Sequence, residues 1–382
     1  MPQIKPEMET FARIKVIGIG GSGKNALNHM MDAKVKGVDF IAVNTDSQDL
    51  HHSLAKKKIH IGKNLTKGLG AGMNPEIGKR AAEETKEEIQ EAIKGGDMVF
   101  IAGGEGGGTC TGAAPIVAKT SKELGVLTIA VITKPFSFEG QQRARLADVG
   151  IEELRKSVDA IIVIPNDKLL TSISKETTAK QAFMMCDEVL KQAVEGISDL
   201  ITTPGTIGNI DFADIRAVLE NAGSALMGIG YASGENRATE AAKGAINSPL
   251  LDISIHGAKS VLFSIAGGDD LTMFEIQDAA KIITESVDPL AKIIFGTVRD
   301  EKLKKGEIKV TVVAAGFPDA GQKKSLFENK PFNLKIDKEK QEKNTTEDKN
   351  VTMPSETPAV AAKEEDDDWG AVPAFLRRSK LK

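Results

Sequence analysis

The sequence GGEGGGTCTG, residues 103–112, joins the apolar run Met98–Ala102 to an alanine-rich segment. The apolar run is predicted to be a buried strand, and the segment after the glycines is predicted to begin a helix. This order of elements places backbone N–H groups and a helix N-terminus around a phosphate. The glycines at 106–108 let the backbone approach an anion closely, and Thr109 and Thr111 add hydroxyl donors. A single glycine run is also compatible with an ordinary surface turn, so the rest of the chain must decide.

Composition restricts the class of protein. The chain has 382 residues, 41% of them hydrophobic, and a formal net charge of −4. Two domains are therefore expected, and nucleic acid is not favoured as a partner. No apolar run approaches about 18 residues, which predicts no direct membrane insertion. Residues 1–11 are polar, lack a signal-peptide core and are predicted to form a flexible arm. Cys110 and Cys186 form neither a metal motif nor a disulfide framework, so a reducing, cytoplasmic location is expected.

A second glycine-rich turn follows the first predicted strand, where residues 18–25 read GIGGSGKN. The segment nearly completes a P-loop, but Asn25 stands where serine or threonine would hold magnesium. The same glycines match the dinucleotide fingerprint, although Asp46 lies somewhat late for the acid that binds the ribose. Either motif predicts a phosphate or ribose site at a helix N-terminus, and the alternative is a tight structural turn.

Up to residue 165 the chain alternates predicted strands with helices. Apolar runs predict strands at 13–19, 39–43, 58–61, 98–102, 126–133 and 160–164. This alternation is typical of a parallel, doubly wound α/β sheet. Glycine, Asn, Asp or Thr follows four or five of these strands, and a further glycine-rich loop lies at 66–75. Since ligands bind at the carboxyl ends of such strands, we expect these residues to face one crevice.

The second half of the folded chain has a different pattern. An amphipathic helix is predicted near 179–201, and its apolar stripe is interpreted as core. Asp211 and Asp214 then lie three residues apart on one helix face, where capping by Asn209 or Asp211 is the simpler explanation. Further strands and helices up to residue 315 predict a second, smaller α/β or α+β domain.

After Phe317 apolar residues become scarce. Residues 318–365 are predicted to be a disordered linker, because they cannot bury enough apolar surface to fold. Residues 366–382 place an acidic run before Trp369, then an apolar helical face, then basic residues. This arrangement is typical of a short docking peptide on a tether, and a disordered end is the alternative.

Taken in order, these motifs resemble the FtsZ family, the bacterial relatives of tubulin. The resemblance is carried by residues 44–46, 68–75, 106–112, 133–140, 164–170, 209–214 and the PAFLRR sequence at 373–378. It implies a Rossmann-like GTP-binding domain at 12–178, a central helix at 179–203 and a GTPase-activating domain at 204–317. It also implies a cytoplasmic protein of the division site that polymerises head to tail.

The resemblance further implies which residues act. GTP, with Mg²⁺ as the expected metal, would be hydrolysed to GDP at the interface between subunits, using Asp211 and Asp214, with Asn209, from the neighbour. Membrane-tethering division proteins such as FtsA would dock on Trp369 to Arg378. The implied nucleotide contacts are Gly20, Gly21, Ser22, Gly23, Lys24, Asn25, Asn44, Gly104, Gly106, Gly107, Gly108, Thr109, Cys110 and Thr111, with Ala71 and Gly72 near the γ-phosphate, Glu139 and Arg143 at the ribose and phosphates, and Asn166, Phe183 and Asp187 at guanine.

Several residues depart from the family's pattern. Cys110 stands where glycine is usual, and a side chain there would cost roughly 1–2 kcal/mol if the backbone needs positive φ. Near a helix N-terminus it is also a candidate reactive thiol. Glu105 is expected to repel a phosphate and Lys24 to offset part of that charge. The stretch from Pro204 to Asn209 is one residue longer than is usual in the family. These departures leave the hydrolysis rate open, so a nucleotide-gated filament scaffold with weak hydrolysis is an alternative.

A dehydrogenase that uses NAD is the alternative from another class. It is suggested by the fingerprint glycines at 18, 20 and 23. It lacks a plausible His or Lys beside a substrate loop, and it leaves the glycine loop at 103–112 unexplained.

Overall fold

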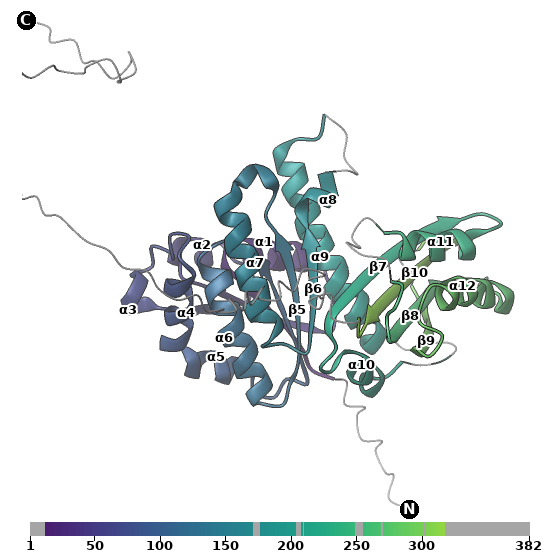
Figure 1. Cartoon of the computed structure of the whole chain (residues 1–382), viewed down its shortest axis with the longest axis horizontal. Helices are drawn as coiled ribbons and strands as arrows, with labels where there is room; N and C mark the ends of the chain where they lie inside the picture. Colours follow the sequence, from purple (N-terminus) through teal and green to yellow (C-terminus); the bar gives the residue numbers. More distant parts are fainter. Residues whose placement is uncertain are drawn as a thin grey trace, which may run out of the picture. The chain divides into compact units, whose positions relative to one another are not determined.

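The computed structural model describes residues 12–170, 176–203, 208, 210–248, 255–268, 270–300 and 303–317. They contain a ten-stranded sheet with the strand order β3-β2-β1-β4-β5-β6-β7-β10-β8-β9. Figure 1 labels β5 to β10 of this sheet and the helices around it. The predicted arm, Asn209, the linker and the docking peptide with Trp369 lie outside the described residues. None of the described helices is long and apolar enough to cross a membrane.

The first six strands form the parallel, doubly wound sheet that the sequence predicts. They are β1 (Ile14–Ile19), β2 (Val38–Asn44), β3 (Lys57–His60), β4 (Met98–Gly104), β5 (Leu127–Lys134) and β6 (Ala160–Pro165), and every neighbouring pair is parallel. The strand order reverses between β1 and β4. The two glycine turns therefore leave the sheet side by side at its carboxyl edge, where such folds bind ligands.

Alternate residues of these strands face two cores. One core joins Ile14, Val16 and Phe100 to apolar residues of α1 (Gly20–Asp32) and α9 (Ala179–Thr202). The other joins Ile17 and Ile101 to the helices on the opposite face, α4 (Pro75–Glu84), α5 (Lys86–Ile93), α6 (Thr109–Glu123) and α7 (Gln141–Arg155). Successive strand residues point to opposite faces, so the near-continuous apolar runs mark a sheet covered on both sides.

One predicted helix is divided. The sequence predicts a single helix from Pro75 to about Lys94, but α4 ends at Glu84 and α5 begins at Lys86. Thr85 between them has φ −111° and ψ 19°, and its hydroxyl accepts a hydrogen bond from the Gly62 N–H at 3.2 Å. The connection to Gly62 fixes Thr85 outside helical geometry, and no local pattern encodes that contact.

The second part of the sheet is mixed. It contains β7 (Gly223–Ser233), β8 (Ser260–Gly267), β9 (Lys292–Arg299) and β10 (Glu307–Ala315), with α10 (Phe212–Leu219), α11 (Arg237–Ile246) and α12 (Met273–Glu285). β10 is antiparallel to β7 and β8, while β8 and β9 are parallel. The sequence left α/β and α+β open for this part, and the mixed sheet fits α+β. Only two residue pairs, Ala160 with Gly223 and Ile161 with Ser224, join β6 to β7.

Candidate nucleotide site

A cavity of about 380 Å³ lies at the carboxyl ends of β1, β4, β5 and β6. Fourteen of the predicted nucleotide contacts line it: Gly20, Gly21, Ser22, Asn25, Gly104, Gly107, Gly108, Thr109, Cys110, Glu139, Arg143, Asn166, Phe183 and Asp187. They come from segments far apart in the sequence, as the convergence of strand ends predicts. We call this cavity the crevice.

Seven predicted contacts do not line the crevice: Gly23, Lys24, Asn44, Ala71, Gly72, Gly106 and Thr111. Several of them shape its walls. A Cβ at Gly23 would lie 2.5 Å from the Ala102 carbonyl oxygen, so glycine permits the tight approach of α1 to β4. Thr111 accepts a hydrogen bond from the Gly106 N–H at 2.9 Å. Ala71 packs on the glycine loop, because a Cβ at Gly108 would lie 2.8 Å from the Ala71 Cβ.

The two glycine turns have the backbone geometry of an anion site. Gly20 has φ +72° and begins α1, and Gly106 has φ +95° just before α6. These left-handed conformations favour glycine. The N-termini of α1 and α6 therefore meet at the crevice, and their unpaired N–H groups carry partial positive charge.

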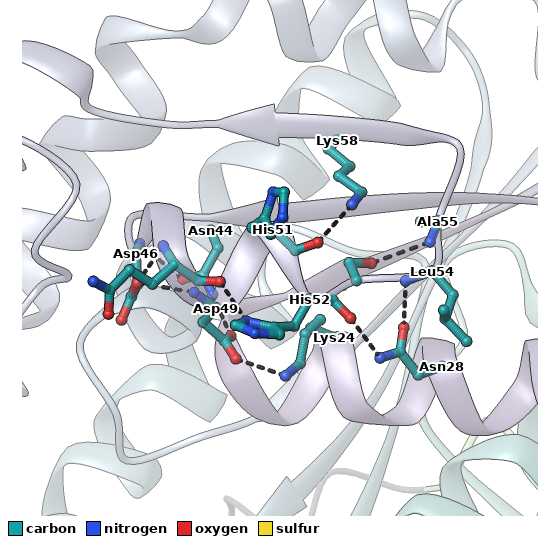
Figure 2. Close-up of polar contacts among 12 residues, drawn as sticks. Lys24, Asn28, Asn44, Asp46, Asp49, His51, His52, Leu54, Ala55 and Lys58 are labelled. Carbon is teal, nitrogen blue, oxygen red and sulfur yellow. Dashed lines mark hydrogen bonds and ion pairs between the residues drawn. The ribbon is translucent and has the colours of Figure 1, made fainter.

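Lys24 is held away from the role that a P-loop lysine plays. Figure 2 shows its ammonium paired with Asp49 of α2 (Ser47–His51), with 2.6 Å between Nζ and Oδ1. The other Asp49 oxygen accepts a hydrogen bond from the Asn44 amide at 2.7 Å. The expectation that Lys24 offsets the charge of Glu105 is therefore wrong. Lys24 and Asn44 are joined by Asp49 into one network beside the crevice.

Asp46 is likewise occupied by local structure. Its carboxylate caps α2, accepting hydrogen bonds from the Gln48 and Asp49 N–H groups at 2.9 and 3.0 Å (Figure 2). A carboxylate engaged in this way is not presented to a ribose, which removes the acid that the dinucleotide fingerprint requires. This engagement of Asp46 counts against the dehydrogenase interpretation.

The far end of the crevice is suited to a purine base. Asn166 is 5% exposed, and its Oδ1 has no hydrogen-bond partner. Phe183 is about half exposed, and its ring meets the buried Phe136 edge to face at 5.4 Å. Burial raises the pKa of Asp187 to about 6, against the opposing charges of His29 and Lys24. An unpartnered buried acceptor and an exposed ring leave room for a ligand's donors and aromatic face.

Ligand affinity is expected to depend on the ionisation of Asp187. The carboxylate accepts two hydrogen bonds from a guanine edge only when it is ionised, and its pKa of about 6 lies above the ordinary value of 3.8. GDP affinity should therefore fall roughly tenfold from pH 7.5 to pH 5. Titration calorimetry at both pH values measures this change. An Asp187→Asn variant should bind weakly with a flatter pH profile, and equal pH profiles in the two proteins would contradict the assignment.

Glu139, which ends the short 3-10 helix η1 (Ser137–Glu139), forms an ion pair with Arg143 in the first turn of α7. The other Glu139 oxygen accepts a hydrogen bond from the Phe136 N–H at 3.0 Å. The side chains of both residues are partly accessible, 16% for Glu139 and 39% for Arg143. Glu139 thus holds the guanidinium at the crevice, where it is positioned to meet an anion.

The expectations for Cys110 are corrected by its position inside α6. Cys110 is not one of the described non-glycine residues with positive φ. Its side chain therefore causes no backbone strain. Its Sγ covers Gly103 and lies 3.7 Å from Glu105 Oε1. Burial, with the charge of Glu105, raises the pKa of this thiol well above its ordinary value. A buried thiol that resists ionisation is a poor nucleophile, so the expectation of a reactive thiol is wrong.

Glu105 points into the packing between α6 and α7. It is 4% exposed, and its Oε2 has no hydrogen-bond partner. A Cβ added at Gly150 would lie 2.5 Å from this oxygen. Burial raises the pKa of this carboxyl to about 7, despite the opposing hydrogen bonds of Thr111 and Cys110. Its repulsion of a phosphate is therefore weakened near neutral pH, because part of the population is protonated.

Replacing Glu105 by glutamine is expected to stabilise the protein at alkaline pH. The pKa of Glu105 is about 7 in the folded protein and 4.5 is its ordinary value. As pH rises from 4.5 to 7, the carboxyl ionises in the unfolded chain before it ionises in the folded protein, and the free energy of unfolding therefore falls. Glu105→Gln should therefore raise the free energy of unfolding by about 2–3 kcal/mol at pH 8 and leave it nearly unchanged at pH 4.5. Urea unfolding at both pH values tests this. A gain of the same size at pH 4.5 would show a packing effect instead.

The two acids assigned to catalysis form a capping box at the start of α10. The Asp214 N–H donates to Asp211 Oδ1 at 2.9 Å, and the Asp211 N–H donates to Asp214 Oδ2 at 3.2 Å. The simpler interpretation, that Asp211 caps this helix, is confirmed. Neither acid lines the crevice of its own chain.

Five crevice residues were not predicted as contacts: Ile19, Glu105, Thr133, Pro135 and Cys186. Thr133 is the penultimate residue of β5 and Pro135 directly follows that strand, so the strand-end argument could have included both. Cys186 precedes Asp187 on α9, and its position required knowledge of how that helix is rotated.

Comparison with known proteins agrees with this geometry. Residues 13–174 match the Tubulin/FtsZ family GTPase domain, and residues 223–318 match the FtsZ family C-terminal domain. An FtsZ from M. jannaschii, solved as an empty dimer, is 46% identical over 81% of this chain and 89% of its own, with a TM-score of 0.76.

More distant structures share the fold. CetZ2 from Haloferax volcanii, solved as a protofilament with GTPγS bound, is 20% identical over 80% of this chain and 94% of its own, with a TM-score of 0.70. CetZ1 from the same organism, solved as a GDP-bound monomer, is 23% identical over 80% and 95%, with a TM-score of 0.69. The match to FtsZ shows that this chain belongs to the Tubulin/FtsZ family and is one of its GTPases.

Proposed function

We propose that this protein hydrolyses GTP at a site completed by a second copy of itself within a head-to-tail filament. The observation that carries the proposal is the separation between the crevice and the two acids assigned to catalysis. The crevice holds the groups that suit a nucleotide, whereas Asp211 and Asp214 lie outside it at the start of α10. Self-association has precedents in the M. jannaschii FtsZ dimer and the CetZ2 protofilament.

No carboxylate among the described residues that line the crevice is placed for an attacking water. Four of its lining side chains are titratable carboxyls or guanidinium groups: Glu105, Glu139, Arg143 and Asp187. Glu105 is packed between helices, Glu139 is paired with Arg143, and Asp187 lies on α9 at the base end. Binding and orientation of GTP would therefore be the work of one subunit.

Acids from a neighbour would supply the missing groups. Asp211 is exposed and Asp214 partly exposed, so both are accessible to a second copy. Carboxylates delivered on assembly would orient a water for attack on the terminal phosphate. A contact that joins different faces of two copies repeats as an open filament, so hydrolysis would be coupled to growth.

Magnesium would depend on the nucleotide. Among the residues the structure describes, no group of three or more His, Cys, Asp or Glu side chains is arranged to hold a metal ion. Magnesium commonly binds through phosphate oxygens and few protein ligands, so the ion would arrive with GTP. It would neutralise charge on the phosphates there.

Membership of the family supports a proposal for the cellular role. We place the filament in the cytoplasm at the division site, in the ring that guides septation. Residues Trp369 to Arg378 would dock on a membrane-tethering division protein such as FtsA, because an apolar and basic peptide on a long tether suits capture by a partner. Direct contact with the bilayer core is not required by this arrangement.

GTP hydrolysis measured against protein concentration, with light scattering in the same cuvette, tests the proposal. A rate per subunit that rises together with scattering above a critical concentration is expected for a shared site. Scattering without phosphate release would select the nucleotide-gated scaffold instead. A rate per subunit independent of concentration would contradict a site completed by a neighbour.

A further inference from the structure

Thr45 is a fully buried residue that connects three segments beside the crevice. It follows β2 and has 0% exposed surface. Its hydroxyl lies 2.7 Å from the Thr109 hydroxyl. Its carbonyl oxygen accepts a hydrogen bond from the Gly70 N–H at 3.3 Å. It also lies 3.1 Å from the Thr66 hydroxyl, whose single proton it shares with the Gly62 carbonyl at 3.0 Å. Thr45 itself does not line the crevice, but Thr109 does.

The backbone around Thr45 is held on both sides. The Asn44 carbonyl accepts a hydrogen bond from the Ile61 N–H at 3.0 Å, and the Ser47 N–H donates to the Gly68 carbonyl at 3.1 Å. With its own carbonyl also hydrogen-bonded, the Thr45 peptide cannot rotate without breaking several buried hydrogen bonds. The Thr45 hydroxyl therefore meets Thr109 from a fixed direction.

The pair of hydroxyls has two arrangements. Each hydroxyl carries one proton, so one of the two must donate to the other. If Thr109 donates to Thr45, the Thr109 oxygen presents only lone pairs to the crevice. If Thr45 donates to Thr109, the Thr109 proton is free for an acceptor. Thr109 is the first residue of α6, so that proton is released at a helix N-terminus suited to an anion.

We propose that Thr45 is a positioning residue for the phosphates of the nucleotide. Its hydroxyl donates to Thr109 and so turns the Thr109 proton toward a phosphate oxygen. Hydrogen bonds in such a chain strengthen one another, and a phosphate selects the arrangement that donates to it. This proposal rests on the proposed function, because it requires that the crevice hold a phosphate-bearing guanine nucleotide.

The test compares GTP with guanosine. Thr45→Val removes the hydroxyl at nearly constant volume, and it should raise the dissociation constant of GTP roughly 3- to 10-fold. Guanosine, which has no phosphate, should bind as it does to the original protein. Thr45→Ser keeps the hydroxyl and should retain the GTP affinity. Competition against a fluorescent guanine nucleotide measures the affinity of each variant for GTP and for guanosine.

A matched control separates positioning from folding. Thr128→Val buries a valine in place of another fully buried threonine, whose hydroxyl bonds Ser121 Oγ at 2.8 Å outside the crevice. Its GTP affinity should not change. If Thr45 serves only to support the fold, Thr45→Val should weaken the binding of guanosine as much as the binding of GTP. Thr45→Ala provides the same comparison if the valine variant does not fold.

A double-mutant cycle tests the route through Thr109. In a Thr109→Val background, adding Thr45→Val should have no further effect on GTP affinity, because the group that Thr45 positions is absent. Additive losses would overturn the proposal, as would unchanged GTP affinity in Thr45→Val alone. Failure of the original protein to bind GTP would instead overturn the proposed function.

Discussion

Asp211→Asn is expected to lower GTP hydrolysis roughly 100-fold while leaving GTP binding and the stability of α10 unchanged. Asparagine is as good an N-cap as aspartate, and its side-chain oxygen can still accept the hydrogen bond from the Asp214 N–H. The change therefore removes the charge and keeps the cap. Phosphate release under assembling conditions, together with GTP titration and thermal unfolding, measures the three properties.

Asp211→Ala provides the matched comparison. Alanine removes both the charge and the cap, so it should also lower the free energy of unfolding by about 1 kcal/mol. If capping alone explains Asp211, the alanine variant should lose activity and the asparagine variant should keep it. That pattern would remove Asp211 from catalysis.

A mixing experiment asks whether the acid acts on a neighbour. Asp211→Asn subunits retain the crevice, and Asp187→Ala subunits retain the acids but should bind GTP poorly. In an equal mixture roughly a quarter of head-to-tail contacts would join an intact crevice to an intact acid. Activity should reappear to about that extent, although neither variant is active alone. No recovery in mixtures that still form filaments would contradict a shared site.

Much of the first sheet could be predicted, because its information is local. Most of its strands contain an apolar run with turn residues close behind it, and β3, with the sequence KKIH, is the exception. Glycines mark the two glycine turns that follow β1 and β4. The parallel order then brings the strand ends together, which is why Gly20, Thr109 and Asn166 meet without any signal that links them in sequence.

What could not be predicted depends on contacts between distant residues. Lys24 and Asp49 are 25 positions apart, and nothing near either residue indicates that they pair. The same holds for Thr85 with Gly62 and for Thr45 with Thr109. Side chains at positions that look like binding residues are used to hold the turns instead.

The departures at Glu105 and Cys110 show a second limit. Judged separately, each appears unfavourable beside a phosphate. In the structure they contact each other, and Gly103 and Gly150 leave the space that their side chains occupy. The two residues fit the fold as a contacting pair, and comparing one position at a time with a family pattern does not reveal this.

The second large effect is expected in the mixed part of the sheet. Arg237 of α11 has 8% of its side chain exposed and pairs with Glu275 of α12, at 2.6 Å from Nε to Oε1. It also pairs with Asp270, which precedes α12, at 2.7 Å from a terminal nitrogen to Oδ2. Arg237→Leu should lower the free energy of unfolding by about 2–3 kcal/mol, because it removes the charged hydrogen bonds that Arg237 makes to the partly buried Glu275 carboxylate. Urea unfolding followed by circular dichroism measures the loss.

An exposed pair on the same helix is the control. Lys243 and Glu240 form an ion pair at 3.4 Å with both side chains more than half exposed. Lys243→Ala should change the free energy of unfolding by less than about 1 kcal/mol. Equal effects of the Arg237 and Lys243 variants would show that burial of Arg237 contributes nothing.

The pH dependence of the Arg237 effect identifies its cause. The hydrogen bond from Arg237 lowers the pKa of Glu275 from 4.5 to about 2. A lowered folded-state pKa stabilises the fold above about pH 4.5, and this contribution is lost as pH falls toward 2. The difference between the original protein and Arg237→Leu should therefore shrink as pH falls from 5 to 3. A difference that stays constant over that range would assign the loss to packing of the arginine's methylene groups, since their burial does not depend on the charge of Glu275.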